Sequence, residues 1–300
     1  MTDPSSAEEV RRRFDDHGYL ADEGMATAVF LTLRLGLPLL LEGEPGVGKT
    51  AAAQVLAKAL DAPLVRLQCY EGLTASEALY DWNHQRQLLA IRIAESQHER
   101  IGEADLFSEE YLVERPILRC IRHDGPRAPV LLIDEVDRAD DEFEALLLEA
   151  LGEGSVTVPE LGTFTAVRPP IVVLTSNRSR DLHDALRRRC LYHWLEYPER
   201  DRELAIVRAR VPEAGDALSK QVAEFVGRLR SQPFANAFQR APGIAESVEW
   251  AKALVALDTL ALDPEIVADT AGILFKQRDD VNALTRDLAA ELLKPEAEPA

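Results

Sequence analysis

The sequence predicts an α/β fold in which a central parallel sheet comes first and a smaller, all-helical domain follows. Three observations lead to this prediction. At 37–60 a short apolar run, a glycine-rich loop and a strong helix former follow one another. The later runs 129–137 and 170–177 are almost continuously apolar, as in parallel strands buried on both faces. After Glu199 the strand patterns stop, and helical patterns separated by prolines fill the chain.

The first part of the α/β region should contain two strands around a glycine-rich loop. We expect an irregular start at 1–20 and a helix at 20–35. A strand at 37–41, a helix at 50–60 and a second strand at 63–70 should follow. Residues 71–122 look mostly helical. A simple crossover between parallel strands needs only about a dozen residues, so this stretch contains an insertion.

The second part of the α/β region should complete the sheet. We expect a strand at 129–137, a helix at 140–154, and a hairpin whose two short strands are 155–158 and 163–166. A strand at 170–177, a short helix at 181–190 and an edge strand at 191–198 should follow. The predicted domains are therefore an α/β domain at 1–198 and a helical domain at 199–292. Residues 293–300 are expected to form a disordered tail.

The composition fits one large domain or two unequal ones. Of the 300 residues 46% are hydrophobic, which is enough for a sizeable core. The 52 acidic residues exceed the 34 basic ones and give a formal net charge of −18. A chain this acidic repels phosphate backbones at long range, so we expect no general nucleic-acid binding.

Cysteine usage and the N-terminal sequence predict a cytoplasmic protein without membrane insertion. Cys69, Cys120 and Cys190 are far apart, and this odd number indicates a reducing compartment. The polar start MTDPSSAEEVRRR is unlike a signal peptide. The longest apolar stretch, 30–41, is too short to span a bilayer. Cys190 and His193 form a C-x-x-H fragment without a second half, so we expect no metal site there.

Residues 43–50 carry the most informative motif, GEPGVGKT, which fits G-x-x-x-x-G-K-[ST]. Its glycines let backbone N–H groups approach phosphate oxygens, and the following helix directs its positive end at the same anion. Lys49 is expected to reach the β- and γ-phosphates, and Thr50 to bind Mg²⁺. The alternative interpretation is a surface turn that contains two glycines, which would lack the strand before the loop and the helix after it. The predicted nucleotide-binding residues are Gly43, Glu44, Pro45, Gly46, Val47, Gly48, Lys49, Thr50 and Ala51.

Polar residues end the two apolar strands at the edge where open parallel sheets bind ligands. Asp134 is expected to hold Mg²⁺ together with Thr50, and Glu135 to act as general base on the attacking water. Asn177 follows the next strand and could bind both the γ-phosphate and the water. The alternatives are a strand end with solvated acids and an ordinary turn asparagine.

Three consecutive arginines, Arg187, Arg188 and Arg189, precede the predicted edge strand. They could form a solvated face. They could also present a cation to the γ-phosphate of a neighbouring subunit, as an arginine finger does. The cluster alone does not show which of the three acts.

With these motifs in this order, the chain resembles an AAA+ ATPase, and its finer pattern is similar to the MoxR family. Within that family it is most similar to the CoxD-type branch, over about residues 18–255. Four stretches carry the resemblance: EGLTASEALYDWNHQRQLLAIRIAE, LLIDEVDRADDEFEALLLEALGEGSVTVPELGT, VVLTSNRSRDLHDALRRRCLYHWLEYPER and PGIAESVEWAKAL. The resemblance implies an AAA+ P-loop domain with a helix-2 insert within 71–119, a hairpin at 155–166, and a helical lid. The hairpin precedes Asn177, which would be the residue called sensor 1.

The resemblance also implies how the protein works. Members form rings, usually hexamers, that bind ATP and Mg²⁺ between adjacent subunits. They are chaperone-like ATPases that often act with a von Willebrand factor A-domain protein. The CoxD-type branch is linked to maturation of a client metalloenzyme, the molybdenum-containing carbon monoxide dehydrogenase.

Individual site residues follow from the same resemblance. Arg189 matches the arginine that serves as finger in relatives, and Arg188 is the second choice. One departure concerns sensor 2, because Gly243 stands where many relatives carry an arginine. Arg240 could substitute, although we expect that it does not. Arg138 could contact a neighbouring subunit or form a surface salt bridge.

Two further expectations concern clients and function class. Tyr80 and Trp82 could contact a client, although burial within the insertion is the favoured interpretation. The favoured function is ATP-driven remodelling of a partner protein. One alternative is an assembly scaffold with little ATP turnover. Another is a DNA-acting motor, which the acidic chain and a hairpin sequence without Lys or Arg disfavour.

Overall fold

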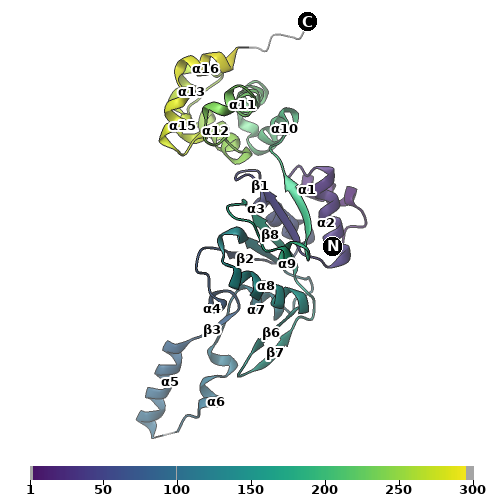
Figure 1. Ribbon diagram of the computed structural model, residues 1–300, viewed down its shortest axis with the longest axis vertical. Coiled ribbons are helices and arrows are strands. Elements are labelled where there is room, and N and C mark those ends of the chain that lie inside the picture. Colours follow the sequence, from purple (N-terminus) through teal and green to yellow (C-terminus); the bar gives the residue numbers. More distant parts are fainter. Residues whose placement is uncertain (1–2, 99, 295–300) are drawn as a thin grey trace. The chain divides into compact units, whose positions relative to one another are not determined.

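The computed structural model describes residues 3–98 and 100–294 in two compact units (Figure 1). The first, here called the sheet unit, comprises the chain up to His17, Ala21–Glu42 and Thr50–Trp194. The second, the helical unit, comprises Gly18–Leu20, Gly43–Lys49 and the chain from Leu195 onward.

A five-stranded sheet forms the centre of the sheet unit, in the order β2-β5-β8-β1-β9. The pairs β2–β5, β5–β8 and β1–β8 are parallel, and β9 lies at one edge, as predicted. All residues of β1 and β5 are buried, which explains the apolar runs 39–41 and 130–133. The strands are β1 (Leu39–Gly43), β2 (Leu64–Gln68), β5 (Val130–Asp134), β8 (Ile171–Ser176) and β9 (Leu191–Leu195).

Helices complete the sheet unit, most of them where the sequence predicts. The expectation of an irregular start was wrong: Val10 and Phe14, one helical turn apart, bury one face of α1, and Ser6 caps it by accepting a hydrogen bond from the Glu9 N–H. α9 is shorter than the predicted 181–190. The helices are α1 (Ala7–Asp16), α2 (Glu23–Leu35), α3 (Lys49–Leu60), α8 (Asp141–Glu153) and α9 (Asp184–Arg187), with a 3₁₀ turn η2 (Val136–Arg138).

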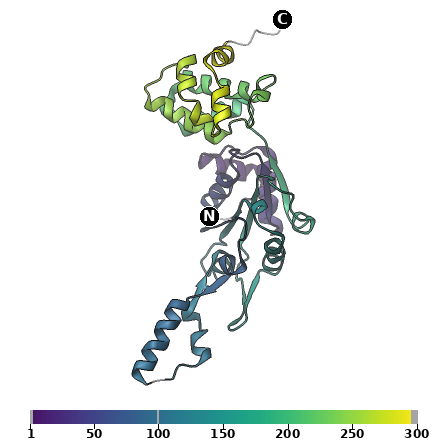
Figure 2. The same ribbon diagram turned by 60° about the vertical axis from the view of Figure 1, so that its left-hand side comes forward.

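The insertion between β2 and β5 is mostly helical, as predicted, but it also contains a two-stranded sheet that the sequence did not indicate. Its strands, β3 and β4, have only three residues each, too few to show an alternating pattern. In Figure 1 and Figure 2, α5 and α6 lie beyond β3 on the side away from the five-stranded sheet. The elements are α4 (Ala75–Ala78), β3 (Tyr80–Trp82), α5 (His84–Gln97), α6 (Glu103–Leu106), η1 (Glu109–Tyr111), β4 (Leu112–Glu114) and α7 (Pro116–Ile121).

The predicted hairpin is confirmed as β6 (Ser155–Val158) and β7 (Gly162–Thr165). The strands are antiparallel, and Gly162 adopts φ 92° where β7 begins, a conformation that favours glycine. Val156 and Val158 are buried and Thr157 is exposed, so one face of β6 packs on the core.

The helical unit packs its helices around Trp250, Phe225 and Leu254, which are almost completely buried. The rings of Phe225 and Trp250 lie 5.3 Å apart. Its elements are α10 (Arg200–Arg210), η3 (Pro212–Ala214), α11 (Gly215–Arg230), η4 (Phe234–Ala237), α12 (Ile244–Ala256), α13 (Pro264–Asp269), α14 (Ala271–Leu274), α15 (Arg278–Ala283) and α16 (Arg286–Leu293). Of the predicted tail, Leu293 ends α16, and residues 295–300 lie outside the described residues.

Candidate functional site

The glycine-rich loop at 43–48 curls around the side chain of Lys49. The Lys49 ammonium donates hydrogen bonds to the backbone oxygens of Gly43 (2.6 Å) and Glu44 (2.8 Å), and the residue is 6% exposed. Gly46 and Gly48 have φ of 84° and 99°, where a side chain would be strained. The loop therefore has the local conformation of a phosphate-binding loop, with its cation directed inward.

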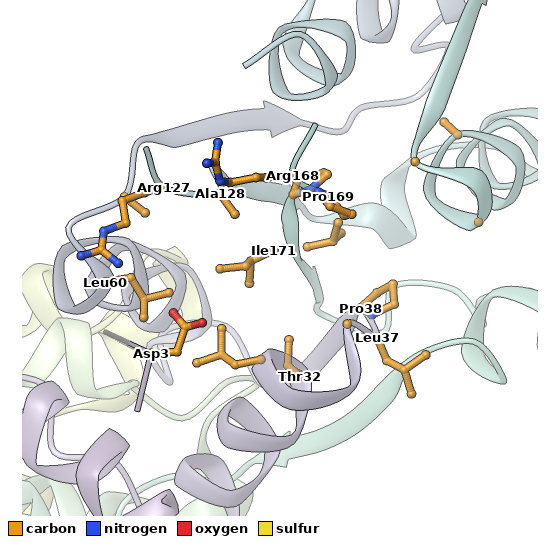
Figure 3. A pocket seen from close by; sticks show the side chains of 18 of the residues that line it. Asp3, Thr32, Leu37, Pro38, Leu60, Arg127, Ala128, Arg168, Pro169 and Ile171 are labelled. Carbon is orange, nitrogen blue, oxygen red and sulfur yellow. The ribbon is translucent and has the colours of Figure 1, made fainter. Parts of the chain in front are cut away.

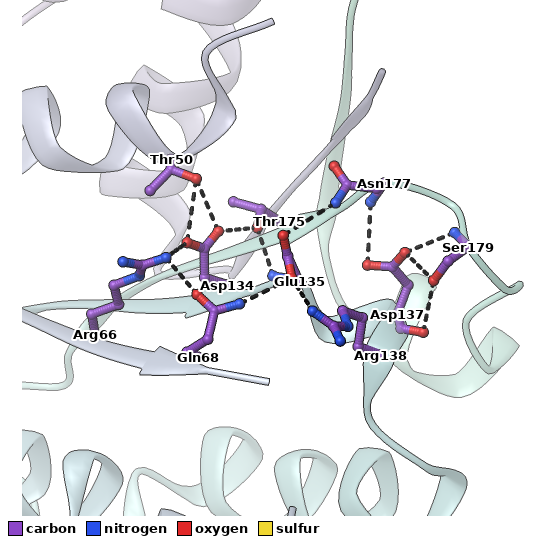
Figure 4. Close-up of polar contacts among 10 residues, drawn as sticks. All are labelled: Thr50, Arg66, Gln68, Asp134, Glu135, Asp137, Arg138, Thr175, Asn177 and Ser179. Carbon is purple, nitrogen blue, oxygen red and sulfur yellow. Dashed lines mark hydrogen bonds and ion pairs between the residues drawn. The ribbon is translucent and has the colours of Figure 1, made fainter. Parts of the chain in front are cut away.

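Thr50 and Asp134 lie within hydrogen-bond distance of each other in the sheet unit (Figure 4). The Thr50 hydroxyl donates to Asp134 Oδ1 (3.0 Å) and Oδ2 (3.3 Å). Thr50 lies in the first turn of α3, which begins at Lys49, and Asp134 ends β5. Because Mg²⁺ prefers a few oxygen ligands at close range, the two side chains fit a shared magnesium ion.

Asp134 is 2% exposed and has two further partners. Arg66 Nη2 lies 2.5 Å from Oδ2, and the Thr175 hydroxyl donates to Oδ1 at 2.5 Å. Arg66 comes from β2 and Thr175 from β8, the strands on either side of β5. The neighbouring strands thus fix the orientation of the carboxylate and balance its buried charge. Neither Arg66 nor Thr175 was predicted from the sequence.

Glu135 presents its carboxylate beside the same strand ends. Its backbone adopts φ 56°, and its N–H donates to the Thr175 hydroxyl at 2.9 Å. Oε1 lies 3.5 Å from the amide nitrogen of Asn177, and Oε2 accepts from Gln68 and Arg138, each at 3.1 Å. This left-handed turn directs the Glu135 side chain toward Asn177, beside Asp134 (Figure 4). The structure therefore brings the predicted base and the predicted sensor together.

Asn177 is held in place by a residue that sequence analysis missed. The Asp137 carboxylate, 2% exposed, accepts from the Asn177 N–H (3.2 Å) and the Ser179 N–H (2.7 Å). The Ser179 hydroxyl donates to the same carboxylate at 2.6 Å. The sequence shows Asp137 as an acidic residue three positions after Asp134. Its burial depends on the segment 177–179 that follows β8 and contacts its carboxylate.

Arg187, Arg188 and Arg189 have different surroundings. Arg187 lies 3.5 Å from the buried carboxylate of Glu42, and Arg189 donates to the backbone oxygen of Leu148 at 2.8 Å. Arg188 is 81% exposed. A finger function for Arg189 or Arg188 stays a prediction. Arg138 pairs with Glu135 within the chain, and its contact with a neighbour likewise stays a prediction.

Gly243 lies against the glycine-rich loop within the helical unit. The Ala245 N–H donates to the Gly46 backbone oxygen at 3.2 Å. A Cβ atom on Gly243 would lie 2.8 Å from Gly46 Cα, which is closer than real Cβ contacts. An arginine at position 243 therefore does not fit without a shift of the loop. Arg240 is exposed, and its substitution for that arginine stays a prediction.

A cavity at the opposite ends of the strands is separate from these residues (Figure 3). It has a volume of about 580 Å³, and its lining includes Pro38, which precedes β1, and Ile171, which begins β8. Asp134, Glu135 and Asn177 lie instead at the carboxyl ends of β5 and β8. This arrangement agrees with ligand binding at the carboxyl edge of parallel sheets.

Cys69 and Cys120 are buried, and Cys190 is half-buried. Burial raises the pKa of Cys69, Cys120 and Cys190 to about 12 in each case, and nearby acids, Asp134 first, contribute at Cys69. Within residues 3–98 and 100–294, no group of three or more His, Cys, Asp or Glu is placed to hold a metal ion. In the same residues, no helix combines the length and apolar character needed to cross a membrane.

Known proteins resemble the chain over most of its length. The gas vesicle ATPase GvpN of Haloferax mediterranei is 26% identical over 277 residues, covering 87% of this chain and 75% of that protein. The denitrification regulatory protein NirQ of Pseudomonas aeruginosa is 26% identical over 210 residues, covering 66% and 68%. A mutant of RuvB from Thermotoga maritima aligns over 93% of this chain and 75% of its own, with 18% identity and a TM-score of 0.49.

The family assignment rests on the region that contains the strand ends described above. Residues 38–190, half of the chain, match the family described as AAA domain (dynein-related subfamily). This match includes the glycine-rich loop, β5 and β8 with their polar ends, and the three arginines. The chain therefore belongs to the dynein-related subfamily of AAA domains and is a nucleotide-binding, ATP-hydrolysing P-loop enzyme.

Proposed function

We propose that the chain is a MoxR-type AAA+ ATPase that uses ATP hydrolysis to remodel a partner protein. The observation that carries this proposal is the cluster of Thr50, Asp134, Glu135 and Asn177 at neighbouring strand ends, each within hydrogen-bond distance of another member or of a shared partner. A phosphate loop, a metal-binding acid, a base and a sensor are the parts that ATP hydrolysis requires.

In this proposal residues 43–51 bind the triphosphate, and Thr50 and Asp134 hold Mg²⁺. The bound metal would supply charge neutralisation at the phosphates. Lys49 turns its hydrogen bonds from Gly43 and Glu44 to phosphate oxygens. Glu135 accepts the proton of the attacking water, and Asn177, 3.5 Å from Glu135, orients that water and the γ-phosphate. Arg66 keeps the Asp134 carboxylate in position.

Assembly and client belong to the same proposal. We infer a ring, by family resemblance a hexamer, in which Arg189 or Arg188 completes the site of a neighbouring copy. A von Willebrand factor A-domain partner and a client metalloenzyme, such as a molybdenum-containing carbon monoxide dehydrogenase, rest on the resemblance to the CoxD-type branch. The relatives found are named for gas vesicles and for denitrification, so similarity does not select the client.

Replacing Lys49 with alanine tests the proposed nucleotide site. Charge-assisted hydrogen bonds contribute about 1.5–3 kcal/mol each, so we expect ATP affinity to fall roughly 10- to 100-fold. The measurement is equilibrium binding of a fluorescent ATP analogue, followed by phosphate release. Lys58→Ala is the matched control, because Lys58 is exposed in the last turn of the same helix. Equal ATP affinity of Lys49→Ala and the wild type would remove Lys49 from the site.

A further inference from the structure

A cavity of about 510 Å³ lies in the sheet unit between the insertion and the hairpin. Its walls include all of β3, Tyr80–Trp82, and residues Ser155–Thr157 of β6. No described residue of β4 or β7, the strands that pair with β3 and β6, lines it. The cavity therefore opens on the outer edges of two small sheets, and its volume is typical of ligand-binding pockets.

The outer edge of β6 presents backbone hydrogen-bonding groups to this cavity. In the hairpin, the Ala166 N–H donates to the Gly154 oxygen at 3.0 Å. Hydrogen-bonded and non-hydrogen-bonded pairs alternate along antiparallel strands, so Thr157 belongs to a non-hydrogen-bonded pair. The 2.9 Å contact between the Thr157 and Thr163 hydroxyls agrees with this. The backbone N–H and C=O of Thr157 consequently point away from β7 and toward the cavity.

β3 has the same arrangement on the facing wall. The Arg115 N–H donates to the Leu79 oxygen (3.2 Å), and the Asn83 N–H to the Tyr111 oxygen (2.8 Å). By alternation, the backbone groups of Tyr80 point away from β4. In the described chain, both small sheets have two strands only, so neither outer edge has a strand partner.

The side chains around these edges are mainly apolar. Besides Tyr80 and Trp82, the lining includes Leu79, Leu146, Val156 and Pro159. Trp82 packs edge to face on Phe107 of the insertion, with ring centres 5.1 Å apart, so its ring is held in one orientation. Asp81 is the one charged residue in the described lining, and Arg115 pairs with it at 3.2 Å. The cavity thus offers, beside an apolar wall, two strand edges that have no strand partner in the described chain.

We propose that this cavity binds an extended, apolar peptide segment of a client protein, which adds as a strand to the outer edge of β6. Unpaired strand edges recognise extended backbone, and the adjacent apolar pockets select the side chains. The three-residue β3 and the four-residue β6 limit the segment to about four residues, since a strand rises ~3.3 Å per residue. This inference rests on the remodelling function proposed above, because it identifies the chemical class of the client segment.

Binding of a designed peptide to the full chain tests the proposal. The probe is a fluorescein-labelled Ser-Val-Thr-Val-Thr-Val-Ser peptide, and the measurement is fluorescence anisotropy without nucleotide. The matched probe carries N-methyl groups on its five central residues, which removes the backbone donors and keeps the side chains. We expect the methylated probe to bind at least tenfold more weakly. Equal binding of both probes, or no binding of either, would overturn strand addition.

Two variants and a control localise the binding. Thr157→Pro removes the outward N–H without breaking the hairpin, and we expect about tenfold weaker binding. Ser76→Trp fills the cavity from an exposed position of α4 and should weaken binding by at least as much. Thr165→Pro is the control, because Thr165 pairs with Ser155 and points outward on the opposite edge of the hairpin. Wild-type binding by Thr157→Pro and Ser76→Trp would contradict the assignment.

The same preparations separate this inference from the proposed function. Phosphate release without peptide binding would remove the peptide site and leave the ATPase assignment intact. Peptide binding without phosphate release would keep the peptide site and remove ATP-driven remodelling. If Thr157→Pro and Ser76→Trp instead dissociate an oligomer, as measured by sedimentation, the occupant is a second copy of this chain, and the client proposal is wrong.

Discussion

Replacing Glu135 with glutamine is expected to leave ATP bound while slowing its hydrolysis about 10²- to 10⁴-fold, the range that general-base catalysis contributes. Glutamine has the same shape, so its amide oxygen can still accept from the Asn177 amide nitrogen. It cannot accept a proton from water. The measurements are phosphate release under saturating ATP and equilibrium binding of ATP to the same variant.

Glu142→Gln is the matched control for this prediction, because it removes one negative charge from an exposed position in the first turn of α8. We expect it to hydrolyse ATP at the wild-type rate. If Glu135→Gln also turned over at the wild-type rate, Glu135 would have no role as base. If Glu135→Gln lost ATP binding instead, its role would be structural, through the bonds to Gln68 and Arg138.

Replacing Arg230 with alanine is expected to destabilise the helical unit by about 3–5 kcal/mol, because it leaves a buried carboxylate without its charge partner. Arg230 donates to Glu203 through Nη1 (2.6 Å) and Nη2 (3.1 Å), and Glu203 is 0% exposed. Burial raises the pKa of Glu203, although Arg230 and the Ser247 hydroxyl oppose this shift. Urea unfolding of the variant, followed by circular dichroism, measures the loss.

A double variant separates the charge effect from packing. Glu203→Met with Arg230→Met removes both charges and keeps much of the volume, so it should recover most of the stability that Arg230→Ala loses. Arg230 also donates to the Pro242 oxygen at 2.8 Å, directly before Gly243. Equal losses in Arg230→Ala and in the double variant would show that this backbone contact, rather than the ion pair, stabilises the unit.

The elements that the sequence predicted best are those whose residues are buried on all sides. β5 and β8 begin with continuous apolar runs because both faces of the sheet are covered. The polar residues that end these runs were therefore easy to recognise in the sequence. The positions of Asp134, Glu135 and Asn177 at one edge then followed from parallel topology. Their hydrogen bonds confirm that the topology brings these residues together; their catalytic roles stay a prediction.

The features that the sequence did not predict depend on contacts between distant segments. β3 and β4 are too short for a periodic pattern, and their pairing joins segments about thirty residues apart in the chain. In the sequence, Asp137 is indistinguishable from a solvent-exposed acid. In the fold, the N–H groups of Asn177 and Ser179, which follow β8, donate to its carboxylate. Arg230 resembles any charged residue at a helix end, and only folding places it on Glu203. The charge of a residue in the sequence does not show which distant residue it will contact in the fold.

We propose that the glycine-rich loop binds ATP whose magnesium ion is held by Thr50 and Asp134. Calorimetric titration of ATP, with Mg²⁺ and with EDTA, into the wild type and Asp134→Asn tests it most directly. We predict that Mg²⁺ strengthens ATP binding to the wild type about tenfold or more, and that this gain disappears in Asp134→Asn. No heat on titration of Mg²⁺ and ATP into the wild type, or an equal gain in both proteins, would contradict the claim.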